Sequence, residues 1–378
     1  MGKNVQVRDM AIYIFEMTII ALFGAILCRE TEKRTKLYIT LCFFMLTFVA
    51  GIRSVNVGVD TEQFCRAYQM IGMTPWNNLL SSFRYEWAFL LLCKVLNYIS
   101  VNPQLLLIVS SILINAPLGV FIFRNSSSAA LSSFLYVGLG LYASNMNIMR
   151  EAIAVSFVLI AFEMLKVNRS LLFFLFVGIA SGFHQTAPFL VILWPLWRLG
   201  FNRKSILVYV TLFIVSFIFA YQISNLIASL LGREQLYNSV FTGSNYFGAL
   251  FKALLALFIA VIVLNYFRVG QRGGIQLSKI DQFYCHMLML WILFSILGMQ
   301  IQIFSRLCMY FNVFAIVGIT CALRFIENAG ERVFIMLLLG VVALSYFIIV
   351  GLFRPEWQGV IPYEVGVDFS GCISLIIR

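Results

Sequence analysis

Charged residues are scarce in this chain of 378 residues: Lys, Arg, Asp and Glu make up 11% of it, against roughly 25% in soluble globular proteins. Hydrophobic residues make up 61%, and the mean hydropathy is +0.93. A soluble fold of this size has no interior large enough to cover so much apolar surface. The composition therefore predicts an all-α, polytopic integral membrane protein.

Motifs for nucleotide and metal chemistry are also missing. The chain has no Walker loop, no paired GxGxxG fingerprint, no HExxH or other metal-ligand spacing and no GxSxG nucleophile turn. Its eight cysteines form no CxxC pair and are interpreted as small core hydrophobes. We therefore expect no metal site and no cofactor. ATP-driven transport and zinc-dependent hydrolysis both lose support.

The formal net charge of +11 does not indicate a nucleic-acid partner. The basic residues are scattered singly between hydrophobic segments rather than gathered in one patch. Membrane orientation and contact with anionic membrane lipids explain such a distribution better.

Apolar windows recur along the whole chain. We interpret each as a transmembrane helix, which needs roughly 20 residues. They predict about 12 transmembrane helices (11–14). No remaining stretch is long enough for a separate module, so residues 1–378 are predicted to form a single integral membrane domain. The windows are 10–28, 37–51, 104–123, 128–148, 150–166, 170–184, 187–199, 205–222, 249–267, 281–300, 306–323 and 332–350.

Short basic connections alternate with the windows and predict the orientation. Those near 29–36, 166–169, 198–204 and 268–279 are placed in the cytoplasm by the positive-inside rule. Both termini then lie outside. The two longest connections, 52–103 and 223–248, are likewise predicted to be external. Within the first of them, Tyr85 to Ser100 is amphipathic and is predicted to be an outer interfacial helix that does not cross the membrane.

Several arginines fall on the predicted outer side, where basic residues are normally depleted. Arg150 and Arg306 each begin a helix that runs inward, where a guanidinium adds to the positive end of the helix dipole and suits a phosphate. The alternative is that the side chains only extend to the lipid headgroups. The outer arginines are Arg53, Arg66, Arg84, Arg150, Arg233, Arg306 and Arg354.

Three further side chains have both a structural and a functional interpretation. Asp60, three residues before Gln63, fits a helix N-cap, and it could also pair with Arg53. His184 lies at the outer end of a helix, either as a base or phosphate ligand or as a hydrogen-bonded structural residue. The other histidine, His286, is interpreted as structural.

A set of landmarks is spread from about residue 51 to 363. They are Arg53 with Val57 to Thr61, Glu86, Asn147 to Arg150 followed by Ala152 to Ala154, Phe183 with His184, Arg306 with Tyr310 and Phe311, and Pro362 with Tyr363. In this order they resemble the EpsG-like exopolysaccharide polymerases, which are relatives in role of the Wzy O-antigen polymerases. The chain departs from the family pattern at Glu151, where glutamine is usual, and at Phe64, where tyrosine is usual.

The resemblance implies transfer of a glycan from its polyprenyl diphosphate carrier onto the next lipid-linked repeat unit, at the outer face of the bacterial inner membrane. Preorganised arginines can stabilise a leaving diphosphate without a metal. We predict that Arg53, Arg150 and Arg306 converge for this purpose. His184, Asp60 and Glu86 are the candidate bases. Partners would be the lipid-linked oligosaccharide, membrane lipids and other polysaccharide assembly proteins. The residues expected to bind substrate are Glu86, Arg84, Asn147, Tyr310 and Tyr363.

Two other functions remain open. A lipid-linked oligosaccharide flippase would also need cations for diphosphates, but it should place them deep in the spans or on both faces. An O-antigen-ligase-like glycosyltransferase would share the diphosphate site and use a different acceptor.

Overall fold

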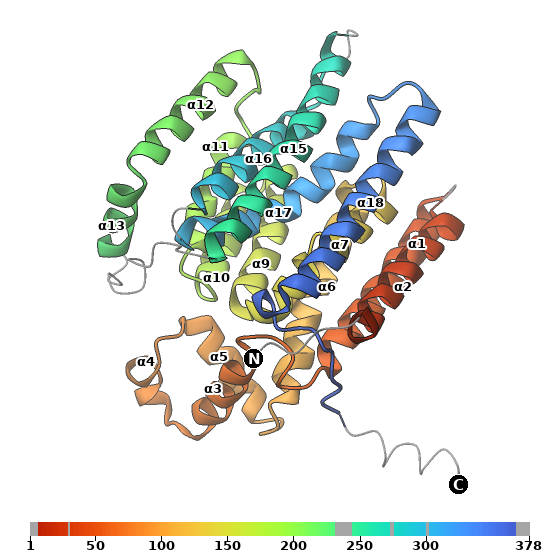
Figure 1. Cartoon of the computed structure of the whole chain (residues 1–378). Helices are drawn as coiled ribbons and strands as arrows, with labels where there is room; N and C mark the ends of the chain where they lie inside the picture. The colour runs from red at the N-terminus through yellow and green to blue at the C-terminus, as the bar shows by residue number, and fades with distance from the viewer. Residues whose placement is uncertain (1–6, 29–30, 231–243, 273–275, 300–301, 368–378) are drawn as a thin grey trace. The chain divides into compact units, whose positions relative to one another are not determined.

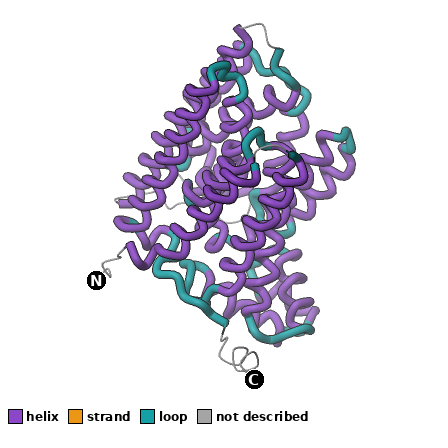
Figure 2. The backbone as a smooth tube through the Cα atoms, turned by 90° about the vertical axis from the view of Figure 1, so that its right-hand side faces the viewer, coloured by secondary structure: helices purple, strands orange, loops and turns teal. Residues whose placement is uncertain are grey.

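The computed structural model describes residues 7–28, 31–230, 244–272, 276–299 and 302–367 of the chain. Helices dominate these residues, as Figure 2 shows, and the described part contains no β-strand beyond one isolated bridge between Arg53 and Val365. The predicted all-α fold is therefore confirmed. The chain divides into two compact units, residues 1–190 with 337–378, and residues 191–336.

In the first unit the long helices pack side by side. Helix α2 packs on α6, α9 on both α6 and α10, and α1 on α7 and α2. The elements are η1 (Val7–Met10), α1 (Ala11–Leu27), α2 (Glu32–Ile52), α3 (Thr61–Met73), η2 (Trp76–Asn78), α4 (Leu79–Ser82), α5 (Trp87–Asn97), α6 (Gln104–Asn125), α7 (Ala129–Gly138), α8 (Leu141–Asn147), α9 (Met149–Lys166), α10 (Ser170–Ser181), the start of η3 (Ala187–Ile192), the part of α18 (Ala329–Phe353) from Leu337 onward, and η4 (Pro355–Trp357).

In the second unit α16 packs between α15 and α17, and α12 packs on α16. Two helices begin with capping boxes that satisfy their first backbone N–H groups, at Asn202 with Ser205 and at Ser278 with Asp281. The elements are α11 (Leu193–Leu196), α12 (Arg203–Ile218), α13 (Ala220–Leu230), α15 (Ser244–Arg272), α16 (Lys279–Leu297) and α17 (Gln302–Leu323).

Two breaks interrupt the apolar window 128–148 and its continuation into α9. Gly140 has φ +74°, in the left-handed region that glycine adopts without steric cost, and it separates α7 from α8. Ile148 (φ −88°, ψ 47°) separates α8 from α9. The second break places Arg150 in the first turn of α9, as the sequence predicts.

Not every apolar window forms a helix of spanning length. Among the described residues, six helices are long and apolar enough to cross a membrane. Other windows fold as shorter helices, such as α7 and α10, or carry more charge, as α9 does, so the predicted count of about 12 crossings is not confirmed. The six are α2, α6, Leu250–Gly270 of α15, α16, Phe304–Leu323 of α17, and α18.

The segment 52–103 folds as the short helices α3 to α5, which lie together at one end of the long helices of the first unit (Figure 1). Helix α5 has 11 residues. At 1.5 Å per residue it is about 16 Å long, roughly half of the 30 Å hydrocarbon core. This length agrees with an interfacial helix at Tyr85 to Ser100. In the other predicted external segment, 223–248, residues 231–243, with Arg233 among them, lie outside the described part.

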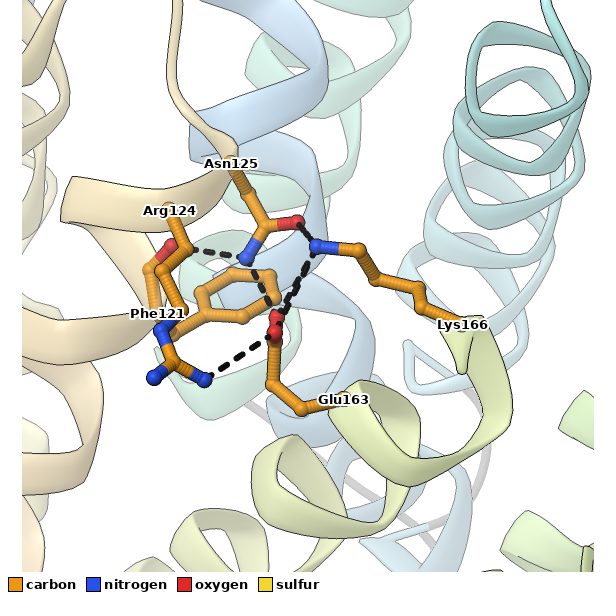
Figure 3. Close-up of polar contacts among 5 residues, drawn as sticks. All are labelled: Phe121, Arg124, Asn125, Glu163 and Lys166. Atoms are coloured by element: carbon orange, nitrogen blue, oxygen red, sulfur yellow. Dashed lines mark hydrogen bonds and ion pairs between the residues drawn. The ribbon is translucent and has the colours of Figure 1, made fainter. Parts of the chain in front are cut away.

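A polar cluster joins the C-terminal ends of α6 and α9 (Figure 3). The Lys166 ammonium donates to Asn125 Oδ1 at 2.7 Å, and Asn125 Nδ2 donates to Glu163 Oε1 at 2.7 Å. Arg124 lies 3.6 Å from Glu163. At their other ends, α6 begins at Gln104 and α9 begins at Met149, followed by Arg150. Polar side chains therefore lie near both ends of α6 and α9.

The orientation can be tested within the first unit alone. In a cysteine-free background, Asn56→Cys is exposed in the segment between α2 and α3, and Val167→Cys is exposed in the α9–α10 turn. We expect a membrane-impermeant thiol reagent added to intact cells to label the cysteine at 56 and not the one at 167. Equal labelling at both positions, or the reverse pattern, would overturn the predicted orientation and the outer location of Arg150.

Candidate functional site

The first turn of α9 carries the central charged contact of the first unit. The Arg150 guanidinium donates through Nη1 to Glu86 Oε2 in an ion pair. Glu86 is the N-cap residue of α5, so the pair links the starts of two helices. The two side chains are 19% and 11% exposed, so they are shielded from solvent yet still reachable. A half-buried pair of this kind interacts more strongly than a surface salt bridge.

Three aromatic rings surround the same guanidinium. Arg150 Cζ lies 4.8 Å from the centroid of the Tyr85 ring, 5.7 Å from that of Phe64 and 5.9 Å from that of Phe89. The rings also contact one another, with centroid separations between 5.4 and 6.3 Å. Such cation–π contacts favour the charged group and fix the plane of its fork. Arg150 Nε is buried and has no hydrogen-bond partner within the part of the chain that the structure describes, so one N–H of the guanidinium group remains unused.

Glu151 lies beside this pair and faces His184, an arrangement that the sequence did not predict. The Glu151 carboxylate is buried, at 1% exposed, and its Oε2 lies 3.8 Å from His184 Nε2. His184 Nδ1 lies 2.7 Å from Thr186 Oγ1. The imidazole therefore lies between a carboxylate and a hydroxyl, which can fix its tautomer and orientation. The only signal in the sequence was the charge next to Arg150.

The turn that bears His184 also holds α5 in place. The Gly182 carbonyl accepts hydrogen bonds from Ala88 N at 2.8 Å and from Phe89 N at 3.3 Å, which satisfies two of the first N–H groups of α5. Glu86 is therefore positioned against Arg150 by a carbonyl only two residues from His184.

Asp60 occupies the N-cap position of α3, but its side chain makes no capping hydrogen bond. The expected capping function is thus absent. Burial raises the pKa of Tyr85, the Arg150 charge opposes that shift, and the Asp60 carboxylate adds to it at smaller size.

Asn147 orders the turn before Asp60. Its Oδ1 accepts from Val59 N at 2.5 Å, and its Nδ2 donates to the Gln358 carbonyl. Gly58 N donates to the Gly359 carbonyl at 2.8 Å. Gly58 has φ +107°, which glycine tolerates and other residues rarely do. The segment after α18 is in this way fastened to the turn that carries Asp60.

Arg53 lies deeper than its neighbours. It is 2% exposed and donates to the Ala50 carbonyl and, at 3.0 Å, to the Met146 carbonyl. It forms no ion pair with Asp60, contrary to one expectation. Tyr363 packs close by and donates through its hydroxyl to the Val49 carbonyl at 2.8 Å. To contact a diphosphate, the Arg53 guanidinium would have to leave these carbonyls.

The remaining predicted residues are more widely distributed. Arg84 is exposed just before Tyr85. Arg306 is half-buried and Tyr310 is fully buried, both on α17. Helix α17 belongs to the second unit. The convergence of Arg306 with Arg53 and Arg150 therefore stays a prediction. Within the described residues, no group of three His, Cys, Asp or Glu side chains could hold a metal ion.

The fold and these contacts define a helical membrane protein with a guanidinium site at one end of its first unit. The sequence profile of the EpsG family matches residues 36–365, which is most of the chain. The protein belongs to the EpsG family, an exopolysaccharide polymerase-like family, and it is a multi-pass membrane protein. No curated protein and no solved structure shows a significant match to the chain.

The contact between α5 and the Gly182 turn can be tested with two glycine substitutions in or next to α10. A Cβ at position 182 would lie 2.6 Å from the Trp87 ring and 2.8 Å from Ala88 Cβ, whereas a Cβ at position 178 would meet nothing within 4 Å. We expect Gly182→Ala to lower polysaccharide output at matched membrane abundance, because α5 must shift and move Glu86. Gly178→Ala should behave as wild type. Equal polysaccharide output from both variants would show that activity does not depend on the position of α5.

Proposed function

We propose that this protein is a polysaccharide polymerase acting at the outer face of the bacterial cytoplasmic membrane. It would transfer a glycan from its polyprenyl diphosphate carrier onto another lipid-linked oligosaccharide unit. The whole chain would act as one integral domain, alongside other polysaccharide assembly proteins. Membership of the EpsG family supports the general class of activity.

The observation that carries the proposal is the Arg150–Glu86 pair under its aromatic cover. The Glu86 carboxylate stands in for an anionic group of a ligand. A diphosphate oxygen carries the same charge and accepts the same guanidinium donors, so it can take this place when Glu86 moves aside. The first turn of α9 adds its own partial positive charge.

The proposed reaction depends on stabilising the negative charge of the leaving diphosphate. A hydroxyl of the acceptor sugar attacks the anomeric carbon, the bond from that carbon to the diphosphate oxygen breaks, and the proton of the hydroxyl passes to a base. Arginines stabilise the negative charge that develops on the leaving diphosphate, and the proposed step uses no metal ion. Arg150 and Arg306 are proposed as the clamp, and Arg53 as a neighbour that holds the ends of α2 and α8 in register.

Three groups remain candidates for the base. His184 has Glu151 on one ring nitrogen and Thr186 on the other. Asp60 is half-buried and makes no capping bond. Glu86 becomes available once it leaves Arg150. We propose His184 first, because a neighbouring carboxylate favours the imidazolium that proton uptake produces. Arg84, Asn147, Tyr310 and Tyr363 are proposed to bind substrate or to shape its site.

The reaction class is tested by giving purified protein in liposomes a single lipid-linked repeat unit. A ladder of lengthened lipid-linked products is expected, and it should persist after metal chelation. A flippase would produce no ladder. A ligase-like transferase would attach a glycan only to a different acceptor. Either of these outcomes would reject the polymerase.

The clamp is tested with Arg150→Lys and Arg306→Lys. Lysine keeps the charge but lacks the planar fork that holds two phosphate oxygens. Loss of one preorganised donor typically lowers a rate by about 10²–10³, so each variant should elongate slowly at matched abundance. Arg66→Lys is the control, because Arg66 is exposed and pairs only with Glu62 on its own helix. Product ladders like those of the wild type from both variants would reject the proposal that Arg150 and Arg306 clamp the diphosphate.

The base is tested by comparing His184→Ala with Asp60→Asn in the same elongation assay. We expect the histidine substitution to lower the turnover number more than the Michaelis constant, because proton transfer belongs to the chemical step. Normal turnover in His184→Ala together with a loss in Asp60→Asn would assign the base to the carboxylate.

A further inference from the structure

A small cavity lies in the first unit, apart from the Arg150–Glu86 pair. Residues of α2, α6, α7 and α8, together with Arg53, line it, and it has room for about one water-sized particle. Its lining is polar at several points even though the surrounding helices are apolar. A polar cavity in such surroundings indicates an occupant that the polar groups can bind.

Most of the polar side chains around the cavity are satisfied by one another. Asn145 Nδ2 donates to the Tyr136 hydroxyl at 3.0 Å, and that hydroxyl donates to Asn115 Oδ1 at 2.9 Å. Asn115 Nδ2 in turn donates to the Ser111 carbonyl at 3.1 Å. Ser111 Oγ donates to the carbonyl one turn earlier, that of Leu107, at 2.7 Å. These groups need no further ligand.

Two buried groups in the lining remain unsatisfied. Ser110 is 1% exposed, and its hydroxyl has no hydrogen-bond partner among the described residues, unlike that of its neighbour Ser111. Arg53 is 2% exposed and leaves Nε without a partner, although its terminal nitrogens donate to two carbonyls. Both unsatisfied groups can donate a hydrogen bond, so the occupant they favour is an acceptor.

The charge of Arg53 further limits which molecule or ion can occupy the cavity. No carboxylate of the described residues forms an ion pair with this guanidinium, and an uncompensated charge in an apolar interior is strongly unfavourable. A neutral water would satisfy the hydrogen bonds but not the charge. A phosphate or a carboxylate is too large for a space of this size. A monatomic anion is only slightly larger than a water molecule and supplies both the hydrogen-bond acceptor and the negative charge.

We propose that the cavity binds a halide ion, chloride under cellular conditions, held by Arg53 Nε and the Ser110 hydroxyl. The ion neutralises the guanidinium that joins the end of α2 to the end of α8. Because Asn147, at the end of α8, orders the turn before Asp60, the bound ion stabilises the region that carries the proposed active site.

The alternative source of negative charge is Glu16 on α1. Glu16 is fully buried and accepts from the Tyr142 hydroxyl at 3.2 Å, while Tyr142 forms part of the cavity wall. An ionised Glu16 could offset Arg53 across the tyrosine, in which case the cavity would hold only water. The test must separate these two possibilities.

The experiment is thermal unfolding of the purified full-length protein in detergent, with sodium chloride exchanged for sodium gluconate at constant ionic strength. The melting temperature should rise with chloride concentration and saturate, as expected for a ligand that binds only the folded state. Bromide should replace chloride. An unchanged melting temperature in both salts would show that the cavity binds water only and would overturn the proposal.

Matched variants test whether the chloride response arises at this cavity. Ser110→Ala should weaken the chloride response at least several-fold in concentration, and Ser111→Ala, at the adjacent position with a satisfied hydroxyl, should keep it. Ser110→Asp supplies a fixed counter-charge and should abolish the response without loss of stability in gluconate. Glu16→Gln should leave the chloride response intact. A chloride response that appears only in Glu16→Gln, or an equal response in Ser110→Ala and wild type, would reject the halide site.

Discussion

The ion pair between Arg150 and Glu86 is the contact on which the rest of the site depends. It joins the start of α9 to the start of α5, and three aromatic rings surround its guanidinium. In a low-dielectric setting a guanidinium needs an anionic partner. Here the partner is Glu86 at the N-terminus of a short helix, and we propose that a ligand anion displaces it. Structure and proposed chemistry therefore share one electrostatic requirement.

Other cations of the first unit also have their charge compensated by polar groups of the chain. Lys94 satisfies its ammonium with three carbonyls at the end of α3, those of Ile71, Gly72 and Thr74. Lys166 is compensated by Glu163 and Asn125. Arg53, like Lys94, is buried and held by carbonyls rather than by a carboxylate. It differs in leaving Nε unsatisfied in the lining of a cavity, which is the reason to infer a bound anion there. Each cation also connects segments that are distant in the sequence, so charge compensation and tertiary structure are coupled.

Hydropathy and charge placement were enough to predict the helical membrane fold, a short helix within Tyr85 to Ser100 and the position of Arg150 in the first turn of α9. These features depend on local composition. The partners of the charges were not predictable, because Glu86 and Arg150 are 64 residues apart and meet only through tertiary packing. The same holds for Glu151 with His184, and for Gln358 with Asn147. Periodicity states which residues share a helix face, but not which distant segment covers that face.

The central claim is that Arg150 binds a diphosphate at the place now taken by Glu86. Equilibrium binding of a sugar-free polyprenyl diphosphate to the purified protein, with Glu86→Gln and Arg150→Gln compared with wild type, tests it most directly. If Glu86 competes with the ligand, Glu86→Gln should bind the diphosphate more tightly, since the neutral amide gives up the guanidinium more readily. Arg150→Gln should bind it much more weakly. Unchanged affinity in both variants would contradict the account.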